Sequence, residues 1–420
     1  MKKLAVVHDK GAVHPMEVYS GLSGTASLVF AVASTPAAQR LLPVMERLGD
    51  VVALTGEHTA DVRALAAHRP DGIVTFSESM LPTTGALAGS LGLPYHDAAT
   101  VTRLTDKHAQ RAALRQAGID TTAQRLLRGA EDWDSAVAAV GLPAVLKPAW
   151  GGGSRDTHRV DDAEAGRRTL RTLLARGPST AGFVLEELLS GSPDSPFGDY
   201  VSVESLVLGG EPEHMAVTGK FPLAPPFRET GQFWPAALDD GARSEVLALT
   251  TGAIQAMGVT SGITHTEIKL TPQGPRIIEV NGRLGGHINE LALRACGVDM
   301  VRLAGLTALG EPVVPVRTAP DRVFWQYNNP APTRPCRLVE VTGWRAACAV
   351  PGVSRYTPYI RAADLVDSGV MTQALDLVSG DAADHAEMRQ QLARVMDLVS
   401  FTFDFEGETR TVPASALAAH

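Results

Sequence analysis

Cysteine is scarce in this sequence, and the few cysteines stand far apart. The 420 residues contain three cysteines, Cys296, Cys336 and Cys348, with no CxxC pair among them. An odd, scattered set excludes a disulfide framework and gives no zinc-binding pattern. It is typical of a protein in a reducing compartment, so the expected location is the cytoplasm.

Long apolar runs and basic clusters are also missing. No uninterrupted apolar segment reaches the roughly 20 residues needed to span a bilayer. The first apolar run stops at His8 and Asp9, so it predicts a β-strand rather than a signal peptide. Lys and Arg number 38 against 46 Asp and Glu, a net charge of -8, and no basic tail occurs. We therefore expect neither a membrane nor a nucleic acid as a partner.

Two familiar nucleotide-binding motifs are absent. No GxGxxG follows the first expected strand and no GxxxxGK(S/T) occurs, which excludes a Rossmann dinucleotide site and a P-loop.

Residues 1 to about 100 alternate short apolar runs with helical spacing, which predicts a small parallel α/β unit. The last run leads into a loop ending at Glu78, and such strand ends bind ligands in open α/β sheets. Expected strands cover 4–8, 51–54 and 72–76, and expected helices cover 36–48 and 60–68.

A glycine triplet marks the second part of the chain. Residues 100–117 predict one amphipathic helix that carries Lys107, and 142–147 predict a strand that ends at Lys147. The sequence Gly-Gly-Gly-Ser (151–154) follows closely, and its bare backbone lets N–H groups surround an anion. Lys147 would add a point charge to a phosphate there. A flexible hairpin turn is the alternative for the same glycines.

A predicted hairpin with its turn at 271–275 carries the most informative acids. Counting outward from the turn places Glu267 opposite Glu279, with Asn281 and Arg283 on the same face. Opposed carboxylates repel each other. A bound Mg²⁺, which prefers oxygen ligands, would remove that repulsion. A solvent-facing hairpin with incidental acids is the alternative.

The rest of the chain predicts strands, helices and one ordered loop. Residues 200–208 predict a strand with Glu204 among apolar neighbours, where an acid lies either on a wet face or in a functional position. Residues 215–234 combine prolines with aromatics and predict an ordered loop over a site. Residues 320–420 predict a small α+β element without a chemical motif, and packing, dimerisation (a homodimer) and a substrate lid are its alternative roles. We expect four units, 1–100, 101–190, 191–315 and 316–420.

Taken in order, these pieces resemble the ATP-grasp superfamily of carboxylate–amine ligases. The resemblance covers about residues 70–310 and is strongest in Thr-His-Thr-Glu-Ile-Lys-Leu (264–270), which is similar to bacterial L-amino acid ligases of the bacilysin type. It implies an ATP-grasp fold with an N-terminal Rossmann-like α/β domain and a small C-terminal α+β subdomain. The elements that carry it are Lys107, Lys147, the glycine-rich loop, Glu186 and Glu187 in Val-Leu-Glu-Glu-Leu, and Glu267 with Glu279.

The resemblance also implies cofactors, substrates and residue roles. The cofactors would be ATP and Mg²⁺, or Mn²⁺ in its place, and the substrates a small-molecule carboxylate and an amine. The nucleotide would be held by Lys107, Lys147, Gly151, Gly152, Gly153, Ser154, Glu186, Glu187 and Leu188, with Glu186 at the adenine amino group and Asp194 a candidate for the ribose. The metal would be held by Glu267, Glu279 and Asn281, and the substrates by Arg283, Gly285, Gly286, Glu204, Arg228 and Glu229.

The implied reaction has two steps. A carboxylate attacks the γ-phosphate of ATP and gives an acyl phosphate and ADP, and an amine then displaces phosphate to form an amide. Arg283 would bind the substrate carboxylate or the transferred phosphate, and Lys147 and Glu204 complete the catalytic set. His265 and His287 are candidates for the base. A bicarbonate-activating or purine-pathway enzyme, a small-molecule kinase and a non-catalytic nucleotide sensor are the alternatives.

Overall fold

A parallel sheet begins the chain, as its βαβ rhythm predicts. The computed structural model describes residues 1–419 except 177–180, 192–194, 315–319 and 367–368. The first sheet has the order β3-β2-β1-β4, and every pairing in it is parallel. Strand β2 and helix α1 were not expected from the sequence. The elements are β1 (Lys2–His8), α1 (Pro15–Leu22), β2 (Ala26–Val32), α2 (Pro36–Leu48), β3 (Asp50–Ala53), α3 (His58–Ala66), β4 (Gly72–Thr75) and α4 (Leu81–Leu91).

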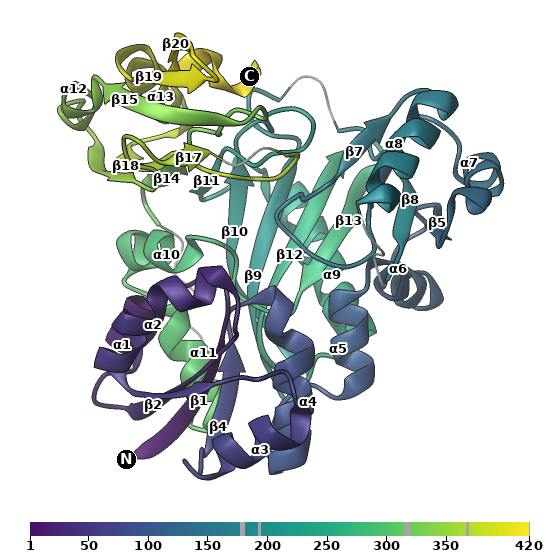
Figure 1. Cartoon of the computed structure of the whole chain (residues 1–420), viewed down its shortest axis with the longest axis vertical. Coiled ribbons are helices and arrows are strands. Elements are labelled where there is room, and N and C mark those ends of the chain that lie inside the picture. Colours follow the sequence, from purple (N-terminus) through teal and green to yellow (C-terminus); the bar gives the residue numbers. More distant parts are fainter. Residues whose placement is uncertain (177–180, 192–194, 315–319, 367–368, 420) are drawn as a thin grey trace.

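An eight-stranded antiparallel sheet forms the centre of the molecule (Figure 1). Its order is β13-β12-β9-β10-β11-β14-β18-β16. Half of the predicted ordered loop at 215–234 is strand, and 221–230 connect β10 to β11. The strands are β9 (Tyr200–Leu208), β10 (Glu211–Lys220), β11 (Gly231–Trp234), β12 (Ser261–Thr271), β13 (Gly274–Asn281), β14 (Val323–Tyr327), β16 (Val353–Pro358) and β18 (Asp376–Ala382).

Helices from three parts of the chain pack around this sheet. Helix α9 (Asp240–Met257) shares an apolar core with β9, β12 and β13. Helix α11 (Met300–Ala308) joins the core of the first sheet, where a side chain at Gly72 would meet the Ala308 carbonyl oxygen at 2.3 Å. Helix α10 (Ile288–Cys296) lies between them in sequence. No helix in the described part of the chain combines the length and apolar character needed to cross a membrane.

The predicted helix over 100–117 is two helices, α5 (Ala98–Thr105) and α6 (Lys107–Gln116). Asp106 separates them with an extended backbone, and its carboxylate accepts hydrogen bonds from the N–H groups of His108 at 2.8 Å and Ala109 at 2.9 Å. An aspartate that caps a new helix interrupts the old one. The break makes Lys107 the first residue of α6, and its N–H donates to the Ala149 carbonyl at 2.9 Å.

A third sheet forms a separate layer that Figure 1 shows beside the central sheet. Its order is β5-β8-β6-β7, and it packs against α7 and α8 through a core that includes the fully buried Trp133. The glycine-rich loop connects β6 to β7, so we call this layer the lid. Its elements are β5 (Gln124–Leu127), α7 (Trp133–Val140), β6 (Ala144–Pro148), β7 (His158–Val160), α8 (Ala163–Ala175) and β8 (Phe183–Glu187).

The last hundred residues form the expected α+β element, but part of it continues the central sheet. Strands β14, β16 and β18 extend that sheet beyond β11. The remaining strands make a fourth sheet, with the order β17-β15-β19-β20. The C-terminal region is therefore joined by hydrogen bonds to the strand that follows the 221–230 connection. Its other elements are β15 (Cys336–Thr342), α12 (Trp344–Cys348), β17 (Leu365–Val366), α13 (His385–Leu398), β19 (Ser400–Phe405) and β20 (Glu408–Pro413).

Candidate active site

The β12–β13 hairpin has the pairing that its sequence predicts. Glu267 lies opposite Glu279, and His265 lies opposite Asn281. The predicted five-residue turn is wrong, because Thr271 already pairs with Gly274. A register shift beside Glu267 compensates for the shorter turn. The acids therefore share one face of the hairpin.

Each acid of the site has a basic partner. Glu279 Oε1 lies 2.9 Å from Lys107 Nζ, which also donates to the Gly151 carbonyl. Glu78, which begins the short 3-10 helix Glu78–Met80 after β4, pairs with Arg283 at 2.6 Å between Oε2 and Nη2. The sequence placed Glu78 at a ligand-binding strand end, but the predicted site left it out. The structure brings it to the hairpin.

Burial and neighbouring positive charges have opposite effects on the pKa values of these acids. Burial raises the pKa of Glu279 despite the nearby Lys107. Burial would also raise the pKa of Glu267, but the hydrogen bond and charge of His265 lower it to about 2. The pKa of Glu78 is lowered, because the charges of Arg283 and Lys107 outweigh its burial. Glu78 and Glu267 stay charged at neutral pH, so the site holds several negative oxygens close together.

The oxygen atoms of this face suit a hard divalent cation. Asn281 is 2% exposed, and its buried Oδ1 has no hydrogen-bond partner among the described residues. Together with the carboxylates of Glu267 and Glu279 it makes a set of oxygen donors of the kind that Mg²⁺ prefers. Glu279 is engaged with Lys107, and within the described ranges no preformed group of three or more His, Cys, Asp and Glu side chains is arranged for a metal. The donor chemistry fits Mg²⁺ nonetheless.

Glu204 does not face an open site, contrary to its predicted role. It is fully buried, Oε1 contacts His265 Nδ1, and Oε2 accepts from the Gly285 N–H at 3.3 Å. His265 Nε2 lies 3.2 Å from Glu267 Oε1, so the imidazole connects the two acids. Burial disfavours its charged form, but Glu204 and then Glu267 raise the pKa of His265 to about 9. A charged imidazole cannot accept a proton, and this argues against His265 as the base.

Gly285 and Gly286 differ in their surroundings. A Cβ at Gly285 would lie 2.5 Å from His265 Nδ1, so the position of the histidine ring leaves room only for glycine here. A Cβ at Gly286 would meet no atom of the described residues within 4 Å. Of the two glycines predicted at the substrate, Gly286 borders open space and Gly285 does not.

Glu186 has other partners than the predicted adenine group. Its carboxylate accepts from Lys147 Nζ at 3.0 Å, from Gln124 Nε2 at 3.1 Å, and from Arg111 through two nitrogens at 3.1 and 3.2 Å. It is 5% exposed, and these cations lower its pKa against the effect of burial. Glu186 therefore fixes Lys147 in the lid and has little capacity left for an adenine amino group.

The backbone beyond Glu186 is only partly engaged. The Glu187 N–H donates to the Ala123 carbonyl at 2.9 Å. The Leu188 N–H has a long contact of 3.4 Å to the Pro143 carbonyl. Leu188 is thus the better-placed donor for a ring edge. Asp194, the candidate for the ribose, lies outside the described residues.

The glycine-rich loop lies over the acids. Gly151 and Gly153 have φ values of 110° and 68°, a region that favours glycine. A Cβ at Gly152 would lie 2.6 Å from Glu78 Oε2. The loop therefore approaches the Glu78–Arg283 pair through bare backbone.

Arg228, predicted at the substrate, is buried and bonded to backbone carbonyls. It is 3% exposed, and its guanidinium donates to the carbonyls of Pro225 at 2.8 Å, Ala331 at 2.5 Å and Ala418 at 3.4 Å. It ties the 221–230 connection to the C-terminal region. The neighbouring Glu229 is held by its backbone, whose N–H donates to Thr372 Oγ1 at 3.1 Å.

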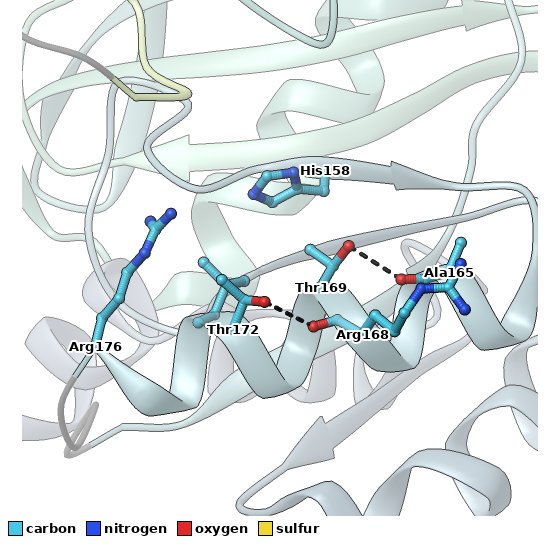
Figure 2. A pocket seen from close by; sticks show the side chains of 7 residues that line it. His158, Ala165, Arg168, Thr169, Thr172 and Arg176 are labelled. Carbon is cyan, nitrogen blue, oxygen red and sulfur yellow. Dashed lines mark hydrogen bonds between the residues drawn. The ribbon is translucent and has the colours of Figure 1, made fainter. Parts of the chain in front are cut away.

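A cavity lies on the lid, away from these residues. Its volume is about 410 Å³, and it lies between β7 and α8. Thr169 and Thr172 donate to the carbonyls of Ala165 and Arg168 in their own helix, as Figure 2 shows. None of the predicted site residues lines this cavity, so it lies apart from the candidate active site. Its lining is His158, Ala165, Arg168, Thr169, Thr172, Leu173 and Arg176.

Known proteins with a similar sequence or structure include ligases. No model of a known protein family matches the sequence. The chain is 28% identical over 249 residues to alanine–anticapsin ligase of Bacillus subtilis, which is 56% of this chain and 52% of the ligase. The chain spans about half the length of the curated relatives it matches.

Solved structures share the whole fold. An L-amino acid ligase from Bacillus licheniformis superposes with a TM-score of 0.77 and 21% identity, over 95% of this chain and 98% of that one. The biotin carboxylase domain of Hydrogenobacter thermophilus 2-oxoglutarate carboxylase, solved with MgADP, gives 0.69 at 14% identity, over 98% and 92%. The ATP-grasp fold and the resemblance to carboxylate–amine ligases are confirmed.

Proposed function

We propose that this chain, an ATP-grasp protein of the carboxylate–amine ligase type, joins an amino acid to an amine and releases ADP and phosphate. The observation that supports the proposal best is the pairing of two cations with two acids beneath the glycine-rich loop. Lys107 pairs with Glu279, and Arg283 pairs with Glu78. A site of this kind can bind a polyphosphate through its cations and a metal through its acids.

The nucleotide would occupy the space between the lid and the hairpin. Lys107 and Lys147 would neutralise phosphate oxygens, and backbone N–H groups of 151–154 would approach the β- and γ-phosphates. The backbone of Glu187 and Leu188 would contact the adenine ring edge. Glu186 would orient Lys147, since the two already lie 3.0 Å apart.

The metal would be held by Glu267, Glu279 and Asn281. Mg²⁺, or Mn²⁺ in its place, would offset negative charge on the transferred phosphoryl group. Lys107 shares Glu279 with that position, so its ammonium would contact the same phosphates.

The substrates would bind on the Arg283 side of the hairpin. The guanidinium already binds one carboxylate, that of Glu78, and a planar fork suits a carboxylate or an acyl phosphate equally. Glu78, in place of Glu204, would face the amino group of an amino acid. Gly286 and Glu229 would border the same substrate.

The proposed reaction needs little from the protein beyond position and charge. The carboxylate would attack the γ-phosphate in line, and the amine would then displace phosphate from the acyl phosphate. Arg283 and the two lysines would stabilise the negative charge that develops. The four units predicted from the sequence would then divide the work, with 101–190 binding the nucleotide and 191–315 the metal and substrates.

Phosphate release tests this proposal. The protein would be incubated with ATP and Mg²⁺ and a panel of single and paired amino acids, with products identified by mass spectrometry. We expect phosphate only with certain pairs, together with a product whose mass is the sum of the two minus water. ADP without free phosphate, with a phosphorylated product, would instead identify a kinase. No phosphate release with any amino acid or amine would contradict the ligase proposal.

A further inference from the structure

The glycine-rich loop is bonded to a segment from the far end of the chain. The Thr372 N–H donates to the Gly153 carbonyl at 2.8 Å. The Asp156 N–H donates to the Val370 carbonyl at 2.7 Å. Both bonds join backbone to backbone, so they fix the path of the loop without depending on its side chains. The segment 369–373 precedes β18 of the central sheet.

The same segment also holds the connection that carries Glu229. Thr372 Oγ1 accepts a hydrogen bond from the Glu229 N–H at 3.1 Å. Thr372 therefore binds the glycine-rich loop through its own N–H and the 221–230 connection through its hydroxyl. One residue touches both sides of the proposed site, the nucleotide side and the substrate side.

Thr372 is fixed by neighbours on its C-terminal side. The Gln373 carbonyl accepts from the Ala331 N–H at 2.8 Å, and the Leu375 N–H donates to the Asn329 carbonyl at 2.8 Å. Arg228, on the 221–230 connection, donates to the Ala331 carbonyl at 2.5 Å. The segment is thus anchored to the residues that follow β14.

We propose that Thr372 is a positioning residue that couples the order of the glycine-rich loop to the order of the Glu229 backbone. This inference rests on the proposed ligase function. A loop of glycines loses much conformational freedom when it is ordered. Two bonds to an anchored segment hold it in one path. Because Thr372 also holds Glu229, phosphates and substrate are enclosed together. ATP is then consumed only when the 221–230 connection is in place.

Hydrogen exchange tests the contact without any turnover. We expect the backbone amides of Asp156 and Thr372 to exchange slowly in the wild-type protein, at least when MgADP is present. Exchange of both amides at the rate of an unstructured peptide, with and without MgADP, would overturn the proposal. An enzyme that is inactive with every substrate would count against the ligase proposal alone, because this measurement requires no product.

Steady-state kinetics test the coupling. Thr372→Val removes the acceptor for the Glu229 N–H and leaves the Thr372 N–H in place. We expect KM for the amino-acid substrate to rise about 3- to 10-fold, the loss of roughly one hydrogen bond, while KM for ATP changes less than about twofold. We also expect more than one ADP per amide formed. Thr372→Ser keeps the hydroxyl and is expected to restore both values.

A matched control comes from the fourth sheet. Thr402 donates or accepts a hydroxyl bond with Thr411 at 3.0 Å in the β19–β20 pair. Thr402→Val removes a threonine hydroxyl from the same region of the chain, and its kinetics are expected to match wild type. Wild-type KM and coupling in Thr372→Val would overturn the proposal. A Thr372→Ser variant whose KM and ADP-to-amide ratio changed as much as those of Thr372→Val would also overturn the proposal.

Discussion

At the scale of single residues, Arg283 makes two contacts that a lysine could not make together. Nη2 binds Glu78 at 2.6 Å and Nη1 donates to the Leu284 carbonyl at 3.0 Å. Arg283→Lys keeps the positive charge but loses the planar guanidinium with its two terminal donor nitrogens. We expect kcat/KM for the amino-acid substrate to fall about 100-fold, a loss typical of one electrostatic contact to the reacting group.

The control for this prediction is an exposed arginine. Arg159 pairs with Asp161 on the lid at 2.8 Å, with about half of its side chain exposed. Arg159→Lys is expected to leave kcat/KM unchanged. An Arg283→Lys enzyme with wild-type kcat/KM would remove Arg283 from the mechanism.

Gly285 and Gly286 give a second prediction at this scale, because a methyl group is tolerated at only one of them. Gly285→Ala places Cβ 2.5 Å from His265 Nδ1, and two acids prevent that ring from moving. We expect the free energy of unfolding to fall by about 1–3 kcal/mol, the usual cost of overpacking.

Gly286→Ala is the matched variant, since its Cβ meets no atom of the described residues within 4 Å. Its free energy of unfolding is expected to stay within about 0.5 kcal/mol of wild type, while kcat/KM falls because the methyl group narrows the substrate space. Denaturant unfolding and kinetics separate the two effects. Equal stability of the two variants would contradict the assignment of Gly285 to His265.

These residues show what a sequence pattern can and cannot identify. Alternation along the hairpin placed Glu267, Glu279 and Asn281 on one face, because side chains in a strand alternate with period two. The same pattern could not show that Glu204 would be fully buried against His265. That contact joins neighbouring strands β9 and β12, and pairing between them is set by the whole sheet.

At the scale of elements, the start of α6 controls where Lys107 lies. Asp106 caps this helix through two hydrogen bonds, and Lys107 is its first residue. Asp106→Ala is expected to lower the free energy of unfolding by about 1 kcal/mol. Because the first turn then frays, we also expect KM for ATP to rise about fivefold, the equivalent of roughly one hydrogen bond.

Another capped helix supplies the control for stability. Asp162 caps α8 by accepting from the Ala165 N–H at 2.8 Å, and it lies on the outer side of the lid core. Asp162→Ala is expected to lose a similar amount of stability without changing KM for ATP. If both variants, or neither, changed KM for ATP, the cap of α6 would have no specific role in placing Lys107.

The elements also show why some boundaries were predicted and others were not. The spacing of 36–48 predicted α2, and Thr35 caps it by accepting from the Ala38 N–H at 3.2 Å. The break at Asp106 was missed, since apolar spacing continues across it and an aspartate inside a helix resembles a surface charge. The predicted turn of the hairpin was one residue out of step, and the register shift beside Glu267 cancelled the error.

At the scale of the whole molecule, three distant parts of the chain meet in one site. Glu78 comes from the N-terminal sheet, Arg283 follows β13, and the loop that covers them belongs to the lid. The motifs gave their order in the sequence, but the contact between the N-terminal sheet and the hairpin depends on how the sheets pack. The pairing of the C-terminal strands with the central sheet was equally unpredictable, since such a pairing leaves no local signal in the sequence.

The Glu78–Arg283 pair predicts a measurable link between the first sheet and the hairpin. Removing one partner leaves the other charge poorly solvated, whereas removing both leaves no unpaired charge. We therefore expect Glu78→Gln and Arg283→Gln each to be destabilised, and the double variant to be less destabilised than their sum by about 1–3 kcal/mol. Denaturant unfolding of the four proteins gives this coupling energy.

The exposed Arg159–Asp161 pair completes the test, because solvent screens it. The cycle of Arg159→Gln and Asp161→Asn is expected to show no measurable coupling.

Additive effects of the Glu78 and Arg283 variants would mean that the pair does not hold the two parts together. Glu78 would then be free to bind a substrate amino group at no cost to the fold. A large coupling means instead that a substrate must compete with Arg283 for Glu78, so an amino acid that offers its own carboxylate to Arg283 and its amino group to Glu78 replaces both partners at once. That exchange favours amino acids over simple acids or simple amines as the first substrate.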